Sequence, residues 1–423
     1  MRYLTAILFI PILFYGCNFS ASDKSEQYFC VTVLAEKSAT ADGGEEIDYQ
    51  LLRLTCKDKT PSYALWIPPS EPSSAAILIA VPYRCIDWTG EDVDIEYALT
   101  ATTVDTDELA TESSTYFRMH EMGVLYIFGR FYAEGNIQND VDDITAGLKF
   151  FERENLVDND RIAVYGSSWG GFEALYGAAH APIDAVPVAG VAIYPLSNFE
   201  DWANYVNNFP NLISDQDKVN EWTDFSLPYQ NRVFSTTGGA PGSQGADYSD
   251  WNTQGLIAKL ETPFLVIHEM WDTLVPFGMS EKLVNESNGN VEPVWFLHED
   301  PLDYDTHDLS HGEISDVYYT FAFVYILTKT ILPSQNITAI YNPDDFHAFM
   351  QYIHKFQDDG YDMEWIVPRL LELTDDRIIM YNTLTGNMST GKALIVQEIN
   401  TVWGLNINED DIAGLFAEGN LPD

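Results

Sequence analysis

A serine set between glycines, in the pattern G-x-S-x-G, is the feature of this chain that points most directly to covalent chemistry. The motif reads Gly166-Ser167-Ser168-Trp169-Gly170, with an apolar run before it and small residues after it. In this pattern the serine stands on a sharp strand-to-helix turn, and the glycines let the neighbouring backbone pass closely. The turn exposes the hydroxyl and directs a helix N-terminus at a developing oxyanion. We therefore predict that Ser168 is a nucleophile.

A serine hydroxyl becomes a useful nucleophile when a histidine takes its proton and a carboxylate orients that histidine. With this motif the partners follow the serine in the order acid, then histidine. Asp272, in the loop after the apolar run 264–268, is the predicted acid, with Glu269 as the alternative. His311, directly before a long helical pattern, is the predicted base, with His307 as the alternative.

The oxyanion formed by such an attack needs two hydrogen-bond donors. The backbone N–H of Trp169 is the predicted first donor. The second is predicted in the loop after the apolar run 76–81, as the backbone N–H or the hydroxyl of Tyr83; the alternative is that Tyr83 only packs against the pocket wall. The cysteines and the eight histidines are scattered and suggest no metal site. The predicted chemistry requires no metal or organic cofactor.

The elements that must position these residues are indicated by the hydrophobic pattern. Apolar runs predict strands, and apolar residues at helical spacing predict helices. Beyond the first strand-like runs, strands alternate with helices, which is typical of a mainly parallel sheet flanked by helices. The expected strands are 29–34, 49–55, 63–67, 76–81, 123–128, 161–165, 186–194, 264–268 and 291–298, and the expected helices are 140–154, 170–180 and 312–329.

Two regions interrupt this alternation of strands and helices, one within the predicted catalytic domain and one after it. The catalytic domain is expected over 28–332. Residues 197–262 contain three tryptophans and a Gly/Ser/Pro stretch, and we predict a lid insertion there. Residues 333–423 contain segments with helical patterns, and we predict a mostly helical C-terminal extension.

The first 17 residues have the pattern of a signal peptide. Arg2 supplies a positive charge, and the apolar run 4–15 is short for a membrane span. Gly16 before Cys17 resembles a bacterial lipoprotein cleavage site, so we expect export either with a lipid on Cys17 or by simple secretion. Residues 18–27 are predicted to be a polar tether.

The acidic composition limits the partners. The formal charge is −44, from 65 acidic and 21 basic residues, and such a surface repels nucleic acid and anionic lipid. We interpret it as a solvated surface suited to salty surroundings; recruitment of a cationic partner or substrate is the alternative. Cys30 and Cys56 flank two strand-like segments and are predicted either to form a disulfide or to remain buried thiols.

Several segments resemble known families. Residues 157–172 (Val-Asp-Asn-Asp-Arg-Ile-Ala-Val-Tyr-Gly-Ser-Ser-Trp-Gly-Gly-Phe) resemble the nucleophile region of the prolyl oligopeptidase catalytic domain. Residues 262–276 resemble that family's acid loop, and Ser310-His311-Gly312-Glu313 its histidine loop. Val81-Pro82-Tyr83-Arg84 is similar to the Pro-Tyr of cocaine-esterase-like and X-Pro dipeptidyl-peptidase hydrolases, in which the tyrosine hydroxyl completes the oxyanion hole.

The resemblance implies an α/β-hydrolase fold with a serine triad and no cofactor. The chain lacks the His-Gly-Gly type loop that prolyl oligopeptidases use after the third strand. We therefore expect an exported hydrolase of small-molecule or polymeric carboxylic esters that forms an acyl-enzyme. A peptidase acting on short peptides is the alternative, and a non-catalytic surface-binding protein on the same fold is a further one.

Overall fold

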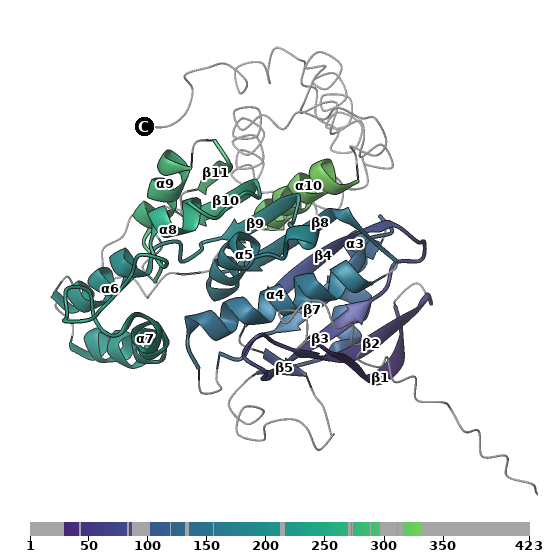
Figure 1. The fold of residues 1–423 in the computed structure, drawn as a ribbon, viewed down its shortest axis with the longest axis horizontal. Helices are drawn as coiled ribbons and strands as arrows, with labels where there is room; N and C mark the ends of the chain where they lie inside the picture. Colours follow the sequence, from purple (N-terminus) through teal and green to yellow (C-terminus); the bar gives the residue numbers. More distant parts are fainter. Residues whose placement is uncertain are drawn as a thin grey trace, which may run out of the picture.

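The computed structural model describes residues 29–41, 44–82, 84–86, 102–118, 120–131, 135–154, 156–211, 216–269, 272, 274–287, 289–296, 311 and 316–331 (Figure 1). Within these residues nine strands form one sheet in the order β1-β2-β3-β7-β4-β8-β9-β10-β11. Their bounds are β1 Val31–Thr40, β2 Glu46–Thr55, β3 Pro61–Ile67, β4 Ser74–Val81, β7 Gly123–Phe128, β8 Val157–Ser167, β9 Ala189–Ile193, β10 Phe264–Glu269 and β11 Val291–Phe296.

The pairs β1–β2, β2–β3 and β3–β7 are antiparallel. In the order of the sheet, every further pairing, from β7–β4 to β10–β11, is parallel. The central strands are continuous apolar runs, such as Gly-Val-Leu-Tyr-Ile-Phe in β7, which is buried throughout. Such runs suit strands that are covered on both faces. The predicted mainly parallel sheet is therefore confirmed. A further pair, β5 Arg84–Ile86 and β6 Thr102–Val104, forms a separate parallel ribbon.

Helices cover both faces of the sheet (Figure 1). Helices α4 Ile137–Arg153, α5 Trp169–Ala179 and α9 Phe277–Glu286 contribute to the core on one face. Helix α10 Asp316–Thr330 contributes to the core on the other face, near α3 Thr115–Arg118. The remaining short helical segments outside the insertion are α2 Thr106–Glu108, η2 Leu109–Ser113 and η3 Ile183–Ala185.

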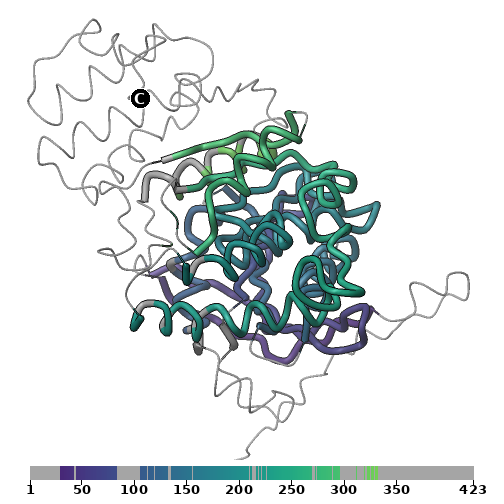
Figure 2. The backbone as a smooth tube through the Cα atoms, turned by 90° about the vertical axis from the view of Figure 1, so that its left-hand side faces the viewer, coloured from purple at the N-terminus to yellow at the C-terminus, as the bar shows by residue number. Residues whose placement is uncertain are grey.

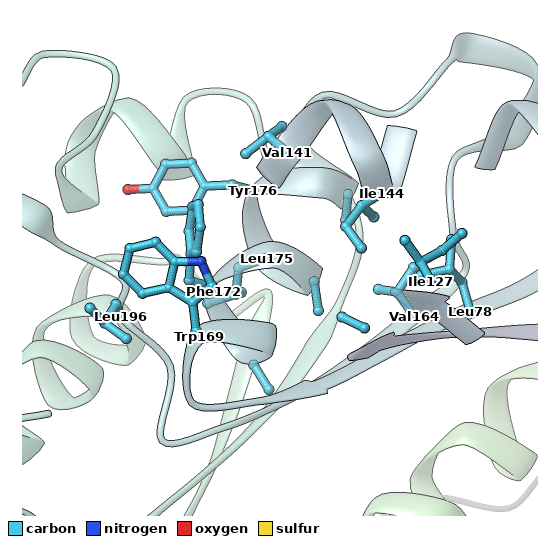
Figure 3. Close-up of a cluster of buried hydrophobic side chains, with 14 of the residues drawn as sticks. Leu78, Ile127, Val141, Ile144, Val164, Trp169, Phe172, Leu175, Tyr176 and Leu196 are labelled. Atoms are coloured by element: carbon cyan, nitrogen blue, oxygen red, sulfur yellow. The ribbon is translucent and has the colours of Figure 1, made fainter. Parts of the chain in front are cut away.

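The core between α4, α5 and the sheet holds the nucleophile helix in place. Val141 and Ile144 of α4 lie near sheet residues such as Val164, and Trp169 and Phe172 extend from α5 (Figure 3). A Cβ on Gly177 of α5 would collide with the Ile144 side chain, so the glycine permits the close approach of the two helices. All of these apolar side chains are buried.

The insertion between β9 and β10 is helical. It contains α6 Phe199–Asn208, η4 Phe209–Asn211, α7 Gln216–Thr237 and α8 Thr253–Ile257. In Figure 2, which looks from the left-hand side of Figure 1, these segments lie toward the viewer. The region 197–262 is thus inserted between two core strands as predicted, and its role as a lid stays a prediction. The predicted signal peptide, tether and C-terminal extension lie outside the described residues.

Of the two alternatives for Cys30 and Cys56, the structure has free thiols, of which Cys56 is buried and Cys30 is partly exposed. The strands do bring the two residues together, because Thr55 N–H donates to the Cys30 carbonyl at 2.9 Å. The Cys56 thiol donates instead to Asp143 Oδ1 at 3.3 Å. Burial, reinforced by the Asp143 charge, raises the pKa of this thiol far above its ordinary value, so Cys56 is a structural thiol. No helix in the described part of the chain is long and apolar enough to cross a bilayer.

Candidate active site

Ser168 stands at the turn between β8 and α5 in a conformation that is rare for a residue with a side chain. Its φ is 55° and its ψ is −121°. The Ser168 N–H donates to the Ile193 carbonyl at 2.7 Å, which ties the turn to the end of β9. A Cβ on Gly166 would collide with the Gly170 carbonyl. The motif therefore needs glycine at position 166, because the end of β8 and the first turn of α5 approach closely there. The predicted nucleophile turn is present.

Ser168, His311 and Asp272 form one hydrogen-bonded chain. Ser168 Oγ lies 2.7 Å from His311 Nε2, and His311 Nδ1 lies 2.7 Å from Asp272 Oδ2. The arrangement requires the Nδ1–H tautomer, in which Nδ1 donates to the carboxylate and Nε2 accepts the serine proton. The His311 side chain is 14% exposed and that of Asp272 is fully buried. The histidine is therefore largely shielded from solvent, and its carboxylate partner completely.

Asp272 is held as an ionised acceptor. Its Oδ1 accepts from the backbone N–H of Leu274 at 2.9 Å and of Val275 at 2.8 Å, which leaves Oδ2 for His311. Burial alone would raise the pKa of Asp272, but the attraction of His311 and hydrogen bonds from His268 and His311 lower it to about 2. The carboxylate is therefore ionised at any pH at which the protein would work.

A second histidine supports the acid loop. His268 is fully buried at the end of β10; its Nε2 donates to the Val275 carbonyl at 2.9 Å and lies 3.5 Å from Asp272 Oδ2. Its Nδ1 accepts from the Ser280 hydroxyl at 2.7 Å. The apolar pattern predicts only that His268 lies at the end of a strand. Its place four residues before Asp272 was the available signal.

Tyr194 packs beside the catalytic histidine, and no motif in the sequence indicates this contact. Its ring packs edge-on against His311, with centroids 5.1 Å apart. Tyr194 follows β9 with a φ of 36°, and its N–H donates to the Ile267 carbonyl at 2.7 Å. A bulky residue in the left-handed region is uncommon and is held by its surroundings.

Trp169, whose backbone N–H is the predicted first donor, lies where such a donor is needed. It is the first residue of α5, and the first N–H groups of a helix have no acceptor within the helix. The helix dipole adds positive potential at the same place. Tyr83, the predicted second donor, lies outside the described residues, as does His307. Glu269 ends β10, whereas the acid that contacts the base is Asp272, as predicted.

The comparison with protein families agrees with this geometry. Residues 128–299 match Peptidase_S9, the prolyl oligopeptidase family. The match begins at the last residue of β7, includes Ser168 and Asp272, and ends before His311. The predicted resemblance to this family's catalytic domain is confirmed over these residues. No protein of curated function matches the chain.

Solved structures with similar folds include peptidases and esterases. A puromycin-hydrolyzing peptidase of Mycobacterium tuberculosis aligns with 67% of this chain at 18% identity and a TM-score of 0.48, and this chain spans 40% of its length. An acetyl xylan esterase from Paenibacillus sp. R4 aligns with 70% of this chain and 89% of its own, at 16% identity and a TM-score of 0.43. A Pyrococcus furiosus esterase aligns with 60% and 83% of the two chains, at 16% identity and a TM-score of 0.39.

The fold class follows from the sheet and the family match together. The sheet has a central parallel part, α4, α5 and α9 on one face and α10 on the other, and a serine turn after β8. The acid follows β10 and the histidine follows β11. The chain has the α/β-hydrolase fold, and its site holds the residues of a serine hydrolase.

Proposed function

We propose that this protein, whose residues 128–299 match the prolyl oligopeptidase family, is a serine hydrolase that cleaves carboxylic esters through an acyl-enzyme. The observation that carries the proposal is that hydrogen bonds connect Ser168 to His311 and His311 to Asp272, each with a donor–acceptor distance of 2.7 Å. A buried acid, an oriented imidazole and a serine on a strained turn are the parts that nucleophilic acyl transfer needs. The substrates would be small-molecule or polymeric esters.

The residues act in a defined order. His311 Nε2 takes the proton of Ser168 Oγ as that oxygen attacks the ester carbonyl carbon. The carbonyl oxygen becomes an oxyanion and accepts from the Trp169 N–H. His311 then gives the proton to the leaving alkoxide, and an alcohol departs from the acyl-enzyme. Water repeats the cycle, with His311 as base, and releases the carboxylic acid and free Ser168. Asp272 stabilises the imidazolium of His311 in both the acylation and the deacylation step.

The three fully buried carboxylates of α4 and α5 are not available to bind the ammonium group of a peptide with a free amino terminus. An ammonium group needs an ionised carboxylate that is not already paired. Asp140 and Asp143 are bound by the guanidinium groups of Arg232 and Arg130, the latter at 2.7 Å. Burial, together with those two carboxylates, raises the pKa of Glu173 well above its ordinary value, which disfavours its ionised form. None of the three offers a free negative charge.

The substrate class can be tested with chromogenic esters and anilides. We expect turnover of p-nitrophenyl acetate and butyrate, and no turnover of aminoacyl p-nitroanilides above the rate of the Ser168→Ala variant assayed in parallel. The anilides decide, because a serine peptidase also cleaves activated esters. Cleavage of the anilides above that background would replace the esterase proposal with the peptidase alternative.

Tyr83 is proposed as the second oxyanion donor, on the resemblance of its Pro-Tyr loop. If its hydroxyl donates, Tyr83→Phe should lower kcat by about 10²-fold and leave KM nearly unchanged, because the lost hydrogen bond belongs to the transition state. Steady-state kinetics with p-nitrophenyl acetate measures this. An unchanged kcat would assign the donor to a backbone N–H instead.

We also propose that the protein is exported, as a lipoprotein anchored through Cys17 or in secreted form. The support is the apolar run 4–15 and the small residue before Cys17. Cell fractionation with the wild type and a Cys17→Ser variant distinguishes the two forms, since only the lipoprotein would leave the membrane fraction on substitution. Cytoplasmic protein in both cases would refute export.

A further inference from the structure

A buried ion pair ties the insertion to the nucleophile side of the sheet. Asp140 of α4 is fully buried, and Arg232 of α7 is 5% exposed. Arg232 Nε donates to Asp140 Oδ2 at 3.1 Å, and a terminal guanidinium nitrogen donates to Asp140 Oδ1. The other terminal nitrogen donates to the Phe131 carbonyl at 2.9 Å. One arginine of the insertion thus contacts both α4 and the loop after β7.

The same carboxylate holds the residue that follows the nucleophile. The indole Nε1 of Trp169 donates to Asp140 Oδ2 at 3.2 Å. The ring is fully buried and packs edge-on against Phe131, Tyr229 and Phe172, with centroids 5.3, 5.3 and 5.1 Å away. Tyr229 belongs to α7, so the insertion also contacts the indole directly. The ring is enclosed by contacts from three parts of the chain.

A buried ion pair is weak evidence for added stability, because the desolvation of both charges offsets their attraction. Charge-assisted, forked hydrogen bonds do impose a specific geometry. Asp140 accepts from the guanidinium and the indole together, so one carboxylate fixes the relative positions of α7 and Trp169. Ser168, next to Trp169, has a positive φ that persists only where the surroundings hold it. The contacts of Trp169 are part of those surroundings.

We propose that Asp140 and Arg232 are positioning residues for the oxyanion donor: by fixing the Trp169 indole, they aim the Trp169 backbone N–H at the substrate oxyanion. The inference rests on the proposed serine hydrolase function. An enclosed indole fixes the Cα of Trp169, and the direction of the N–H depends on that position. The insertion thereby contributes to catalysis through its anchor, whether or not it covers the site.

Trp169→Phe is the decisive variant, because it keeps an aromatic ring and deletes the indole N–H. We expect kcat for a p-nitrophenyl ester to fall about 10- to 100-fold, with KM within about twofold, since a misaimed donor is felt in the transition state. The affinity for phenylboronic acid should fall by the same factor. Its tetrahedral adduct on Ser168 places a hydroxyl or oxyanion in the same hole.

Asp140→Asn and Arg232→Lys test the ion pair itself. The asparagine keeps an acceptor for the indole and removes the charge; the lysine keeps the charge and removes the fork. Both should lower kcat and boronic acid affinity in parallel. Because Asp140 acts through the indole, Asp140→Asn should have little further effect on kcat in the Trp169→Phe background. If a variant of the pair does not fold, Trp169→Phe alone decides.

Trp66→Phe is the matched control. Trp66 is fully buried in the same apolar core, where it packs against Phe150 and Phe151, away from the triad. Its substitution should lower Tm and leave kcat and boronic acid affinity unchanged. The same pattern in Trp169→Phe would overturn the positioning role. Labelling of the wild type by a fluorophosphonate reports separately on the proposed function: no labelling refutes that function, whereas labelling with normal Trp169→Phe kinetics refutes only the positioning role.

Discussion

Replacing Ser168 with alanine should leave a folded protein whose turnover is about 10³-fold or more below the wild type. The hydroxyl is the only part of the side chain that the substitution removes, and it is the atom that attacks. Alanine accepts the same backbone conformation at a similar cost, so the turn at φ 55° should persist. The residual rate would come from the oxyanion donor and substrate binding alone.

Ser167 provides the matched control for this experiment. It is the residue immediately before the nucleophile, at the end of β8, and Ser167→Ala removes the same atoms. Only Ser168→Ala should lose both ester turnover and covalent labelling by a fluorophosphonate, with thermal unfolding recorded for both. Retained turnover in Ser168→Ala, or its loss in Ser167→Ala, would assign the nucleophile to a different residue.

Asp272→Asn should lower kcat by about 10⁴-fold while substrate binding is largely kept. The asparagine can present its NH₂ group to His311 Nδ1, which favours the tautomer with the proton on Nε2. In that tautomer Nε2 donates and can no longer accept the Ser168 proton. The loss of the negative charge also leaves the imidazolium unpaired during the reaction. Steady-state kinetics on a p-nitrophenyl ester measures the loss.

Glu269→Gln is the comparison for the acid, since Glu269 is the other carboxylate near the end of β10. It should retain most of the activity. The wild-type rate should show no ionisation of Asp272 above pH 3, because the pKa of that carboxyl is lowered to about 2. A large loss of kcat in Glu269→Gln, together with near wild-type kcat in Asp272→Asn, would reverse the assignment of the acid.

The triad was predictable because each member follows a strand with a clear apolar pattern. Ser168 lies in a motif whose glycines are required by backbone contact, and Asp272 and His311 come after β10 and β11 in the expected order. Strand positions were predicted well for the same reason: the central strands are buried on both faces and read as continuous apolar runs.

The helices of the insertion, the Tyr194 contact and the state of the cysteines depend on tertiary contacts, which local sequence patterns do not contain. Helix α7 has a largely polar sequence with Pro228 inside it, and its buried Arg232 binds Asp140 and the Phe131 carbonyl, which are distant in sequence. Tyr194 holds a positive φ because β10 and His311 surround it. Cys30 and Cys56 lie close together at the ends of their strands, yet both are free thiols, and the Cys56 thiol donates a hydrogen bond to Asp143.

The order of strands in the sheet also affects how this protein acquires activity as it folds. The central strand β4 pairs with β7 and β8, both later in the chain, and Ser168 and His311 are 143 residues apart. Contacts between distant segments form slowly, because the entropy of closing long loops is lost before the contacts are made. Local helices such as α4 need no such closure. Secondary structure should therefore precede turnover during refolding, because enzymatic activity requires Ser168, Asp272 and His311 to be brought together from distant parts of the chain.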